Sequence, residues 1–218
     1  MNRKQLASII DHTNLRAYAT QVDIAELCDE AVTHGFAAVT VNPAWTSYCA
    51  KRLAGKPVRV NAVVGFPLGA NSAHVKLEET REALRNGAHE LDVVINIGAL
   101  KSGFPDFVEK EIAAVVRAAA GKPVKVILET SYLSDEEKVA VCQMSVRVGA
   151  AFVKTSTGYG NAGATVADVQ LMRSAVKNKI GIKAAGGVRS YRDAAALIQA
   201  GATRIGTSAA IKILSEAP

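Results

Sequence analysis

Residues 151–160 read Ala-Phe-Val-Lys-Thr-Ser-Thr-Gly-Tyr-Gly, and in this stretch a short apolar run ends on Lys154 before a hydroxyl- and glycine-rich turn. The apolar run is typical of a buried strand. A lysine at the end of such a strand is costly unless it is paired, hydrated or neutral. A neutral lysine is a nucleophilic amine that can form a Schiff base with a carbonyl compound, whereas an ion-paired lysine only holds strands together. The stretch itself supports both interpretations, so the rest of the chain must separate them.

The same alternation of short apolar runs and amphipathic segments continues along the whole chain. Strands are predicted at residues 9–13, 37–42, 58–65, 91–96, 124–129, 151–155, 180–185 and 203–207. Helices are predicted between most of them, for example at 73–85, 106–119, 135–148 and 166–176. Capping boxes are expected at helix starts, where a hydroxyl is followed three residues later by an acid, in the pairs Thr20/Asp23, Ser134/Glu137, Thr165/Asp168 and Ser190/Asp193.

Eight β/α units in 218 residues predict one α/β domain that spans residues 1–218, a closed parallel TIM (β/α)8 barrel. An open doubly wound sheet is the alternative. Against it, no Gly-x-Gly-x-x-Gly motif follows the first predicted strand, and no linker or composition shift marks a domain boundary.

Composition and charge narrow the function classes. The chain is 49% hydrophobic and 21% charged, which is the balance of a soluble globular protein. Its formal charge of +6 comes from scattered basic residues, which disfavours nucleic-acid binding and suits an anionic small substrate. Three widely spaced cysteines suggest neither a disulfide framework nor a zinc site, so we expect reduced thiols and a cytoplasmic location. No run has signal-peptide or membrane-spanning length, and neither a metal nor a cofactor is expected.

Charged residues also interrupt two other predicted strands. Lys183 lies in the seventh strand and Asp92 in the fourth. Functional residues of such a barrel sit at the carboxyl ends of the strands, so both would share a cavity with Lys154. Two neighbouring ammonium groups disfavour each other's protonated form, which lowers one pKa and makes that amine nucleophilic. Asp92 would balance the remaining charge or relay a proton. A structural Lys–Asp–Lys network is the alternative, but the three residues together favour catalysis.

Glycine-rich loops follow the last two predicted strands. Gly186-Gly187-Val188 precedes a capped helix, and Gly206-Thr207-Ser208 opens another. Glycines there let backbone N–H groups point at an anion, and these two loops are the usual phosphate site of this fold. Gly158, after Lys154, would close a third side. A single Gly-Gly pair could make only a tight turn, but two such loops on adjacent strands predict a phosphate site.

Two further polar residues at predicted strand ends leave their roles open. His12 lies at the end of the first predicted strand and is either a catalytic base or, more often for a single histidine, a hydrogen-bonded structural residue. Glu129 ends the fifth strand and is either a pocket carboxylate or an ion-pair partner inside the barrel.

With these residues assembled, the chain resembles the deoxyribose-phosphate aldolases, a family of class I aldolases with a (β/α)8 barrel, over nearly its full length. The segments that carry the resemblance are residues 63–69, 125–130, 152–158 and 182–189. The resemblance implies reversible cleavage of 2-deoxy-D-ribose 5-phosphate to glyceraldehyde 3-phosphate and acetaldehyde. It implies Lys154 as the Schiff-base lysine, Lys183 as the lysine that tunes it, and Asp92 as the proton-transfer partner.

The resemblance also implies where the substrate binds. The phosphate would be held mostly by backbone N–H groups of Gly158, Gly186, Gly187, Val188, Gly206 and Ser208, and Asp11 and Thr13 match positions of the family's substrate pocket. The chain departs from the family in four places. Residues 14–17 read Asn-Leu-Arg-Ala where many members have Leu-Leu-Lys-Pro, and Ala209 stands where many members have a second serine. Tyr159 stands where some members have a lysine, and the C-terminal tyrosine of some members is missing. These changes put phosphate affinity and the proton-transfer rate in question.

Two other functions stay in view. An isomerase or synthase on a phosphate-binding barrel would keep both glycine loops without needing a Schiff base, and a non-catalytic sugar-phosphate sensor would keep the scaffold alone. Only the aldolase requires Lys154, Lys183 and Asp92 together. We also expect a homo-oligomer, with a dimer as the first choice, that binds a phosphorylated sugar and neither nucleic acid nor membrane.

Overall fold

A ring of eight parallel strands, paired in sequence order from β1 to β8, forms the centre of the molecule in the computed structural model, which describes residues 1–218. The strands are β1 (Ile10–Asn14), β2 (Ala38–Val41), β3 (Arg59–Val64), β4 (Glu90–Val94), β5 (Val124–Ile127), β6 (Phe152–Lys154), β7 (Gly181–Ala185) and β8 (Arg204–Thr207). β8 also pairs with β1, with Gly206 opposite Asp11. This pairing closes the sheet, so the predicted TIM barrel is confirmed and the open-sheet alternative is wrong.

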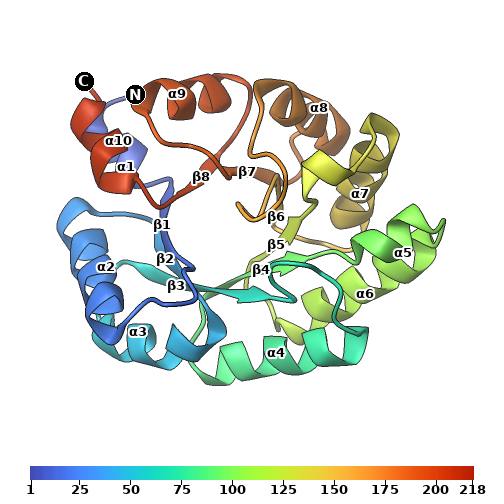
Figure 1. The fold of residues 1–218 in the computed structure, drawn as a ribbon, viewed down its shortest axis with the longest axis horizontal. Coiled ribbons are helices and arrows are strands. Elements are labelled where there is room, and N and C mark those ends of the chain that lie inside the picture. The colour runs from blue at the N-terminus through green and yellow to red at the C-terminus, as the bar shows by residue number, and fades with distance from the viewer.

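Helices surround the ring on its outer side (Figure 1). They are α1 (Arg3–Ala7), α2 (Gln21–His34), α3 (Thr46–Arg52), α4 (Ala73–Arg85), α5 (Ile97–Lys101), α6 (Pro105–Ala118), α7 (Asp135–Arg147), α8 (Val166–Val176), α9 (Tyr191–Gln199) and α10 (Ala210–Glu216), with 3-10 turns η1 (Pro43–Trp45) and η2 (Thr130–Tyr132). The two termini lie side by side, where Arg3 Nε donates to the Ala217 carbonyl at 2.8 Å. No helix is both long and apolar enough to span a membrane.

The predicted helix caps form, two of them in full. At Thr20 and Ser134 the hydroxyl accepts from the backbone of the third helical residue, and the acid at that position accepts from the cap's own N–H. Thr165 and Ser190 make the first of these bonds, but the return bond to their own N–H is missing. All four hydroxyls therefore satisfy an N–H group that the helix geometry leaves free.

The two faces of the strands have opposite character. On β4, Leu91 and Val93 belong to the apolar core between the strands and the helices. Glu90 and Asp92 alternate with them, so they face the inside of the barrel, and both are fully buried. The interior of the barrel thus contains buried charges enclosed by an apolar layer, and charges there interact more strongly than they would in water.

Candidate active site

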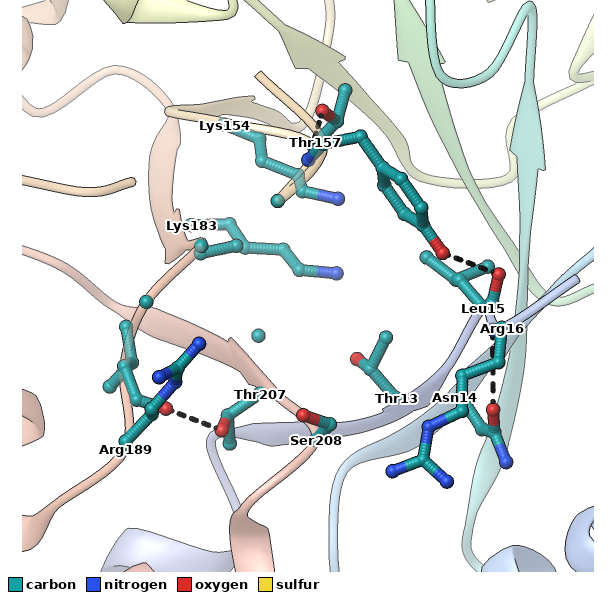
Figure 2. A pocket seen from close by; sticks show the side chains of 17 residues that line it. Thr13, Asn14, Leu15, Arg16, Lys154, Thr157, Lys183, Arg189, Thr207 and Ser208 are labelled. Carbon is teal, nitrogen blue, oxygen red and sulfur yellow. Dashed lines mark hydrogen bonds between the residues drawn. The ribbon is translucent and has the colours of Figure 1, made fainter. Parts of the chain in front are cut away.

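A cavity of about 220 Å³ opens at the carboxyl ends of the strands. The residues that line it come from the ends of β1, β6, β7 and β8 (Figure 2): Thr13, Asn14, Leu15, Arg16, Lys154, Thr157, Gly158, Tyr159, Lys183, Ala185, Gly186, Gly187, Val188, Arg189, Gly206, Thr207 and Ser208. Every residue predicted for the phosphate site is among them, together with Thr13 and both lysines. The topology therefore brings residues as far apart in sequence as Thr13 and Ser208 to one end of the barrel, because parallel strands all end on the same side.

Lys154 and Lys183 stand next to each other on paired strands, where they are register partners. Figure 2 shows both side chains extending into the cavity from the same side. The Nζ atoms of both residues lie 2.8 Å from the same oxygen, Asp92 Oδ2. All three residues are almost completely buried. The predicted Lys–Asp–Lys set is thus assembled, with the carboxylate bridging the two amines at hydrogen-bond distance.

The pKa of Lys154 is lowered to about 8. Burial is the main cause, because it penalises the charged form. Asp92 opposes the change, and the charge of Lys183 adds to it. The sequence-based explanation assigned the effect mainly to Lys183; the structure corrects that order, since desolvation comes first. With this pKa, about one molecule in ten has a free amine at pH 7, against about one in a few thousand for an ordinary lysine.

Asp92 stays ionised in spite of its burial. Burial alone would raise the pKa of this carboxyl, but Lys125, Lys154 and Lys183 hold it well below its ordinary value. Lys125, on β5, donates to Asp92 Oδ1 at 3.0 Å. The carboxylate therefore has a cation on each of its two oxygens, and its Oδ2 side is the one that can exchange a proton with Lys154 and Lys183.

Asp11 is not among the cavity-lining residues. It is fully buried, with Oδ2 2.5 Å from Lys183 Nζ and Oδ1 2.8 Å from Arg204. Asp11 was placed in the substrate pocket on the basis of the family resemblance; in the structure it binds Lys183, as Asp92 does. Its contact with a substrate stays a prediction.

Sequence reasoning missed three charged residues of the barrel interior: Lys125, Glu90 and Arg204. All three are buried. A signal for them existed, because each interrupts or borders a predicted apolar strand, as Asp92 does. It also missed Arg16 and Arg189, two exposed arginines that lie on opposite sides of the cavity (Figure 2).

The glycine loops form a cradle of unused backbone donors. Gly186 and Gly187 have φ values of 88° and 75°, a left-handed conformation that glycine adopts without strain. The N–H groups of Gly158, Gly186, Gly187, Val188 and Ser208 donate to no other group of the chain. Free N–H groups that converge from three loops fit an anion such as a phosphate group.

Glu129 has neither of the roles that were considered for it. It lies outside the cavity lining and in no ion pair, and its φ of 56° is left-handed. Its Oε2 accepts from the N–H of Thr157 at 3.1 Å and from the Thr157 hydroxyl. The Thr157 hydroxyl in turn accepts from the N–H of Tyr159 at 3.0 Å. Glu129 therefore holds the loop that follows Lys154.

Tyr159 extends that loop across the mouth of the cavity. Its hydroxyl donates to the carbonyl of Leu15 at 2.6 Å, a bond that Figure 2 marks at Leu15. Its ring meets Phe66 edge-on with centroids 5.5 Å apart. The residue that replaces a lysine of some family members thus joins the β6 loop to the β1 loop, and the positive charge near the glycine cradle comes from Arg16 and Arg189 instead.

His12 points away from this cavity. Its Nε2 lies 2.6 Å from Glu30 Oε2 on α2, and burial lowers the pKa of the imidazole. This arrangement supports the structural interpretation of His12. No group of three or more His, Cys, Asp or Glu side chains is arranged to hold a metal ion.

Comparison with known proteins agrees with this geometry. Residues 6–216 match the model of the DeoC/LacD family of aldolases. The deoxyribose-phosphate aldolase of Streptococcus uberis is 56% identical over 206 residues, which is 94% of each chain. That of Aciduliprofundum boonei is 53% identical over 216 residues, covering 98% of this chain and 97% of its own. The solved tetrameric deoxyribose phosphate aldolase of Aeropyrum pernix superposes with a TM-score of 0.92 at 38% identity, covering 98% of this chain and 91% of that one.

Proposed function

This chain belongs to the DeoC/LacD family of aldolases, and on that premise we propose that Lys154 forms the Schiff base of its class I aldolase reaction. The reaction is the reversible cleavage of 2-deoxy-D-ribose 5-phosphate to D-glyceraldehyde 3-phosphate and acetaldehyde. The observation that carries the residue assignment is the lowered pKa of Lys154, about 8, at the wall of a cavity that also contains the anion cradle. The isomerase and sensor alternatives are set aside, since the family is one of aldolases.

The steps follow from the chemistry of a neutral amine. Lys154 Nζ attacks the aldehyde carbon of the open-chain sugar, and loss of water leaves an iminium ion. The iminium accepts the electron pair of the bond between C2 and C3 as the C3 hydroxyl loses its proton, so glyceraldehyde 3-phosphate leaves and an enamine remains. Protonation of the enamine carbon and hydrolysis release acetaldehyde and restore the amine.

Lys183 and Asp92 are proposed to serve the proton transfers. Both lysines share Asp92 Oδ2 at 2.8 Å, so a proton can move among the three groups without a large change in geometry. Asp92 remains ionised and stabilises the positive charge that develops on the iminium nitrogen. The phosphate end of the sugar would lie on the free N–H groups of the three loops, with Arg16 and Arg189 as the nearby cations.

The pH dependence of imine formation tests the state of Lys154. Reductive trapping of acetaldehyde with cyanoborohydride should add a two-carbon group at Lys154, with a rate that rises with pH to a midpoint near 8, because only the neutral amine attacks. Peptide mass spectrometry of samples quenched along a pH series measures this rate. Exposed Lys212 in the same digests reports nonspecific alkylation. A profile at Lys154 that follows the profile at Lys212 would contradict the assignment.

Gly187 allows a matched test of the phosphate site. A Cβ atom at this position would meet no atom within 4 Å, and aspartate and asparagine, which have nearly the same shape, tolerate a positive φ better than most residues. Gly187→Asp places a negative charge in the cradle and should raise KM for the phosphorylated sugar about tenfold or more over Gly187→Asn. Steady-state kinetics with 2-deoxyribose 5-phosphate and 2-deoxyribose separates the two effects. Equal losses for both sugars in both variants would mean that the loop is only structural.

We also propose that the enzyme is a homo-oligomer that works in the cytoplasm. Oligomerisation is supported by the relative from Aeropyrum pernix, which is described as tetrameric; for this chain a dimer remains the prediction. The cytoplasmic location is supported by Cys28, Cys49 and Cys142, which are all buried free thiols. Light scattering on the purified protein measures the subunit count.

A further inference from the structure

The interior of the barrel holds a closed cluster of seven charged side chains. Its carboxylates are Asp11, Glu90 and Asp92, and its cations are Lys125, Lys154, Lys183 and Arg204. The most exposed of these side chains is that of Arg204, at 11%, and all seven residues are buried. One further cation reaches the cluster from outside, Arg59, which lies 2.7 Å from Glu90 Oε1, but 55% of its side chain is exposed, so water screens its charge.

Lys125 lies close to all three carboxylates of this cluster. Its Nζ lies 2.6 Å from Glu90 Oε2, 3.0 Å from Asp92 Oδ1 and 2.8 Å from Asn61 Oδ1. Asp11 Oδ2 is 3.8 Å away. Lys125 is fully buried and does not line the cavity. It can therefore affect a substrate only through the groups it contacts.

The charges below the cavity balance without Lys154. Burial would raise the pKa values of all three carboxyls, but the cations hold each below its ordinary value, so all three are ionised. Burial would lower the pKa values of Lys125 and Arg204, but the carboxylates raise both. Three carboxylates thus face Lys125, Lys183 and Arg204, and Lys154 is the surplus cation. The pKa of Lys154 is lowered, to about 8.

We propose that Lys125 is a positioning residue for the reaction: its charge offsets Glu90 and Asp92 from below, so that Lys154 becomes the surplus cation of the cluster and gives up its proton to become the nucleophile. This inference rests on the proposed Schiff-base role of Lys154. It extends the lysine–lysine–aspartate set to a residue that never touches the substrate.

The groups around Lys154 determine the direction of the effect. Asp92 on β4 favours its protonated form, Lys183 on β7 and Lys125 on β5 disfavour it, and the ring of Phe66 lies 5.9 Å from its Nζ. Asp11 on β1 acts through Lys183, to which it is bound at 2.5 Å. Without Lys125, the same carboxylates would face one cation fewer, and Lys154 would keep its proton to higher pH.

Three variants test this charge balance. Lys125→Met removes the cation but keeps a side chain of similar size. Glu90→Gln removes one carboxylate charge, and the double variant removes both charges. The pH midpoint of reductive acetaldehyde trapping at Lys154, measured by peptide mass spectrometry, should move up in Lys125→Met, move down in Glu90→Gln and return close to the wild-type value in the double variant. An upward move of about one unit would slow trapping at pH 7 about tenfold.

Lys76→Met is the matched control. Lys76 is also fully buried; it is bound to Glu111 at 2.7 Å and to the Val94 carbonyl at 2.8 Å, and it lies outside the cluster. The same substitution there should lower the melting temperature but leave the trapping midpoint at Lys154 unchanged. A midpoint that moves equally in Lys76→Met would mean that any loss of a buried lysine disturbs the site.

Several outcomes decide the inference. If Lys125→Met does not fold, Glu90→Gln and the double variant still carry the test, because opposite charges are removed from the same ion pair. An unchanged or raised midpoint in Glu90→Gln, or a double variant that keeps the midpoint of Lys125→Met, would overturn the proposal. A wild-type protein that traps no acetaldehyde at Lys154 would instead refute the Schiff-base assignment, which is a separate result.

Discussion

Lys154→Met should cleave 2-deoxyribose 5-phosphate at least about 10⁴-fold more slowly than the wild type, the size of loss seen when an essential nucleophile is removed. Methionine keeps the length and packing of the buried stem but has no amine to form an imine. Asp92 would still be bound by Lys183 at 2.8 Å and by Lys125 at 3.0 Å, so no carboxylate is left without a cation. The variant is therefore expected to fold, with a melting temperature at or above that of the wild type.

Two measurements complete this test. Circular dichroism establishes that the Lys154→Met protein is folded, and reductive trapping with acetaldehyde should then give no active-site adduct. Lys183 is the internal comparison, since its Nζ lies at the same distance from Asp92 as that of Lys154. A variant that retains activity and traps acetaldehyde at Lys183 would exchange the roles of the two lysines.

Lys183→Met is expected to reduce the rate at pH 7 by roughly 10²- to 10⁴-fold, the range for loss of a group that transfers protons. The substitution removes the ammonium that lies 2.8 Å from Asp92 and 2.5 Å from Asp11. The pKa of Lys154 should rise as a consequence, because Lys183 is one of the charges that lower it. The free amine at neutral pH then becomes scarcer, and the pH–rate profile of cleavage should shift to higher pH.

The pH–rate profile also separates two roles of Lys183. If its charge only lowers the pKa of Lys154, the Lys183→Met enzyme should approach the wild-type rate at high pH. If Lys183 also moves a proton, the deficit should persist at every pH. Arginine is a poor control here, because Gly206 leaves little room: a Cβ at that position would lie 2.8 Å from Lys183 Cε. Wild-type rates and an unchanged profile in Lys183→Met would remove Lys183 from the mechanism.

Most of the architecture was predictable from local sequence. Thr20 and Ser134 mark helix starts through bonds to residues three positions away, and each apolar strand shows its burial in its own composition. Local signals of this kind require no knowledge of the partners, which is why the eight strands and the four helices predicted with bounds were found within a few residues of their observed ends. Lys154, Lys183 and Asp92 could be identified because each is a charged residue in a strand that is otherwise apolar.

The sequence by itself therefore determined the barrel, its glycine loops and the set of Lys154, Lys183 and Asp92. These features follow from periodicity and from the rule that parallel strands all end on one side of the barrel. Only the tertiary structure decided which charges meet inside. Lys125 lies on β5, yet its partners come from β1, β3 and β4. A pKa depends on burial and on charges within a few ångströms, and neither can be read from positions 30 or more residues apart. Closure of β8 onto β1 brings Arg204 to Asp11 and completes the balance that leaves Lys154 as the surplus cation.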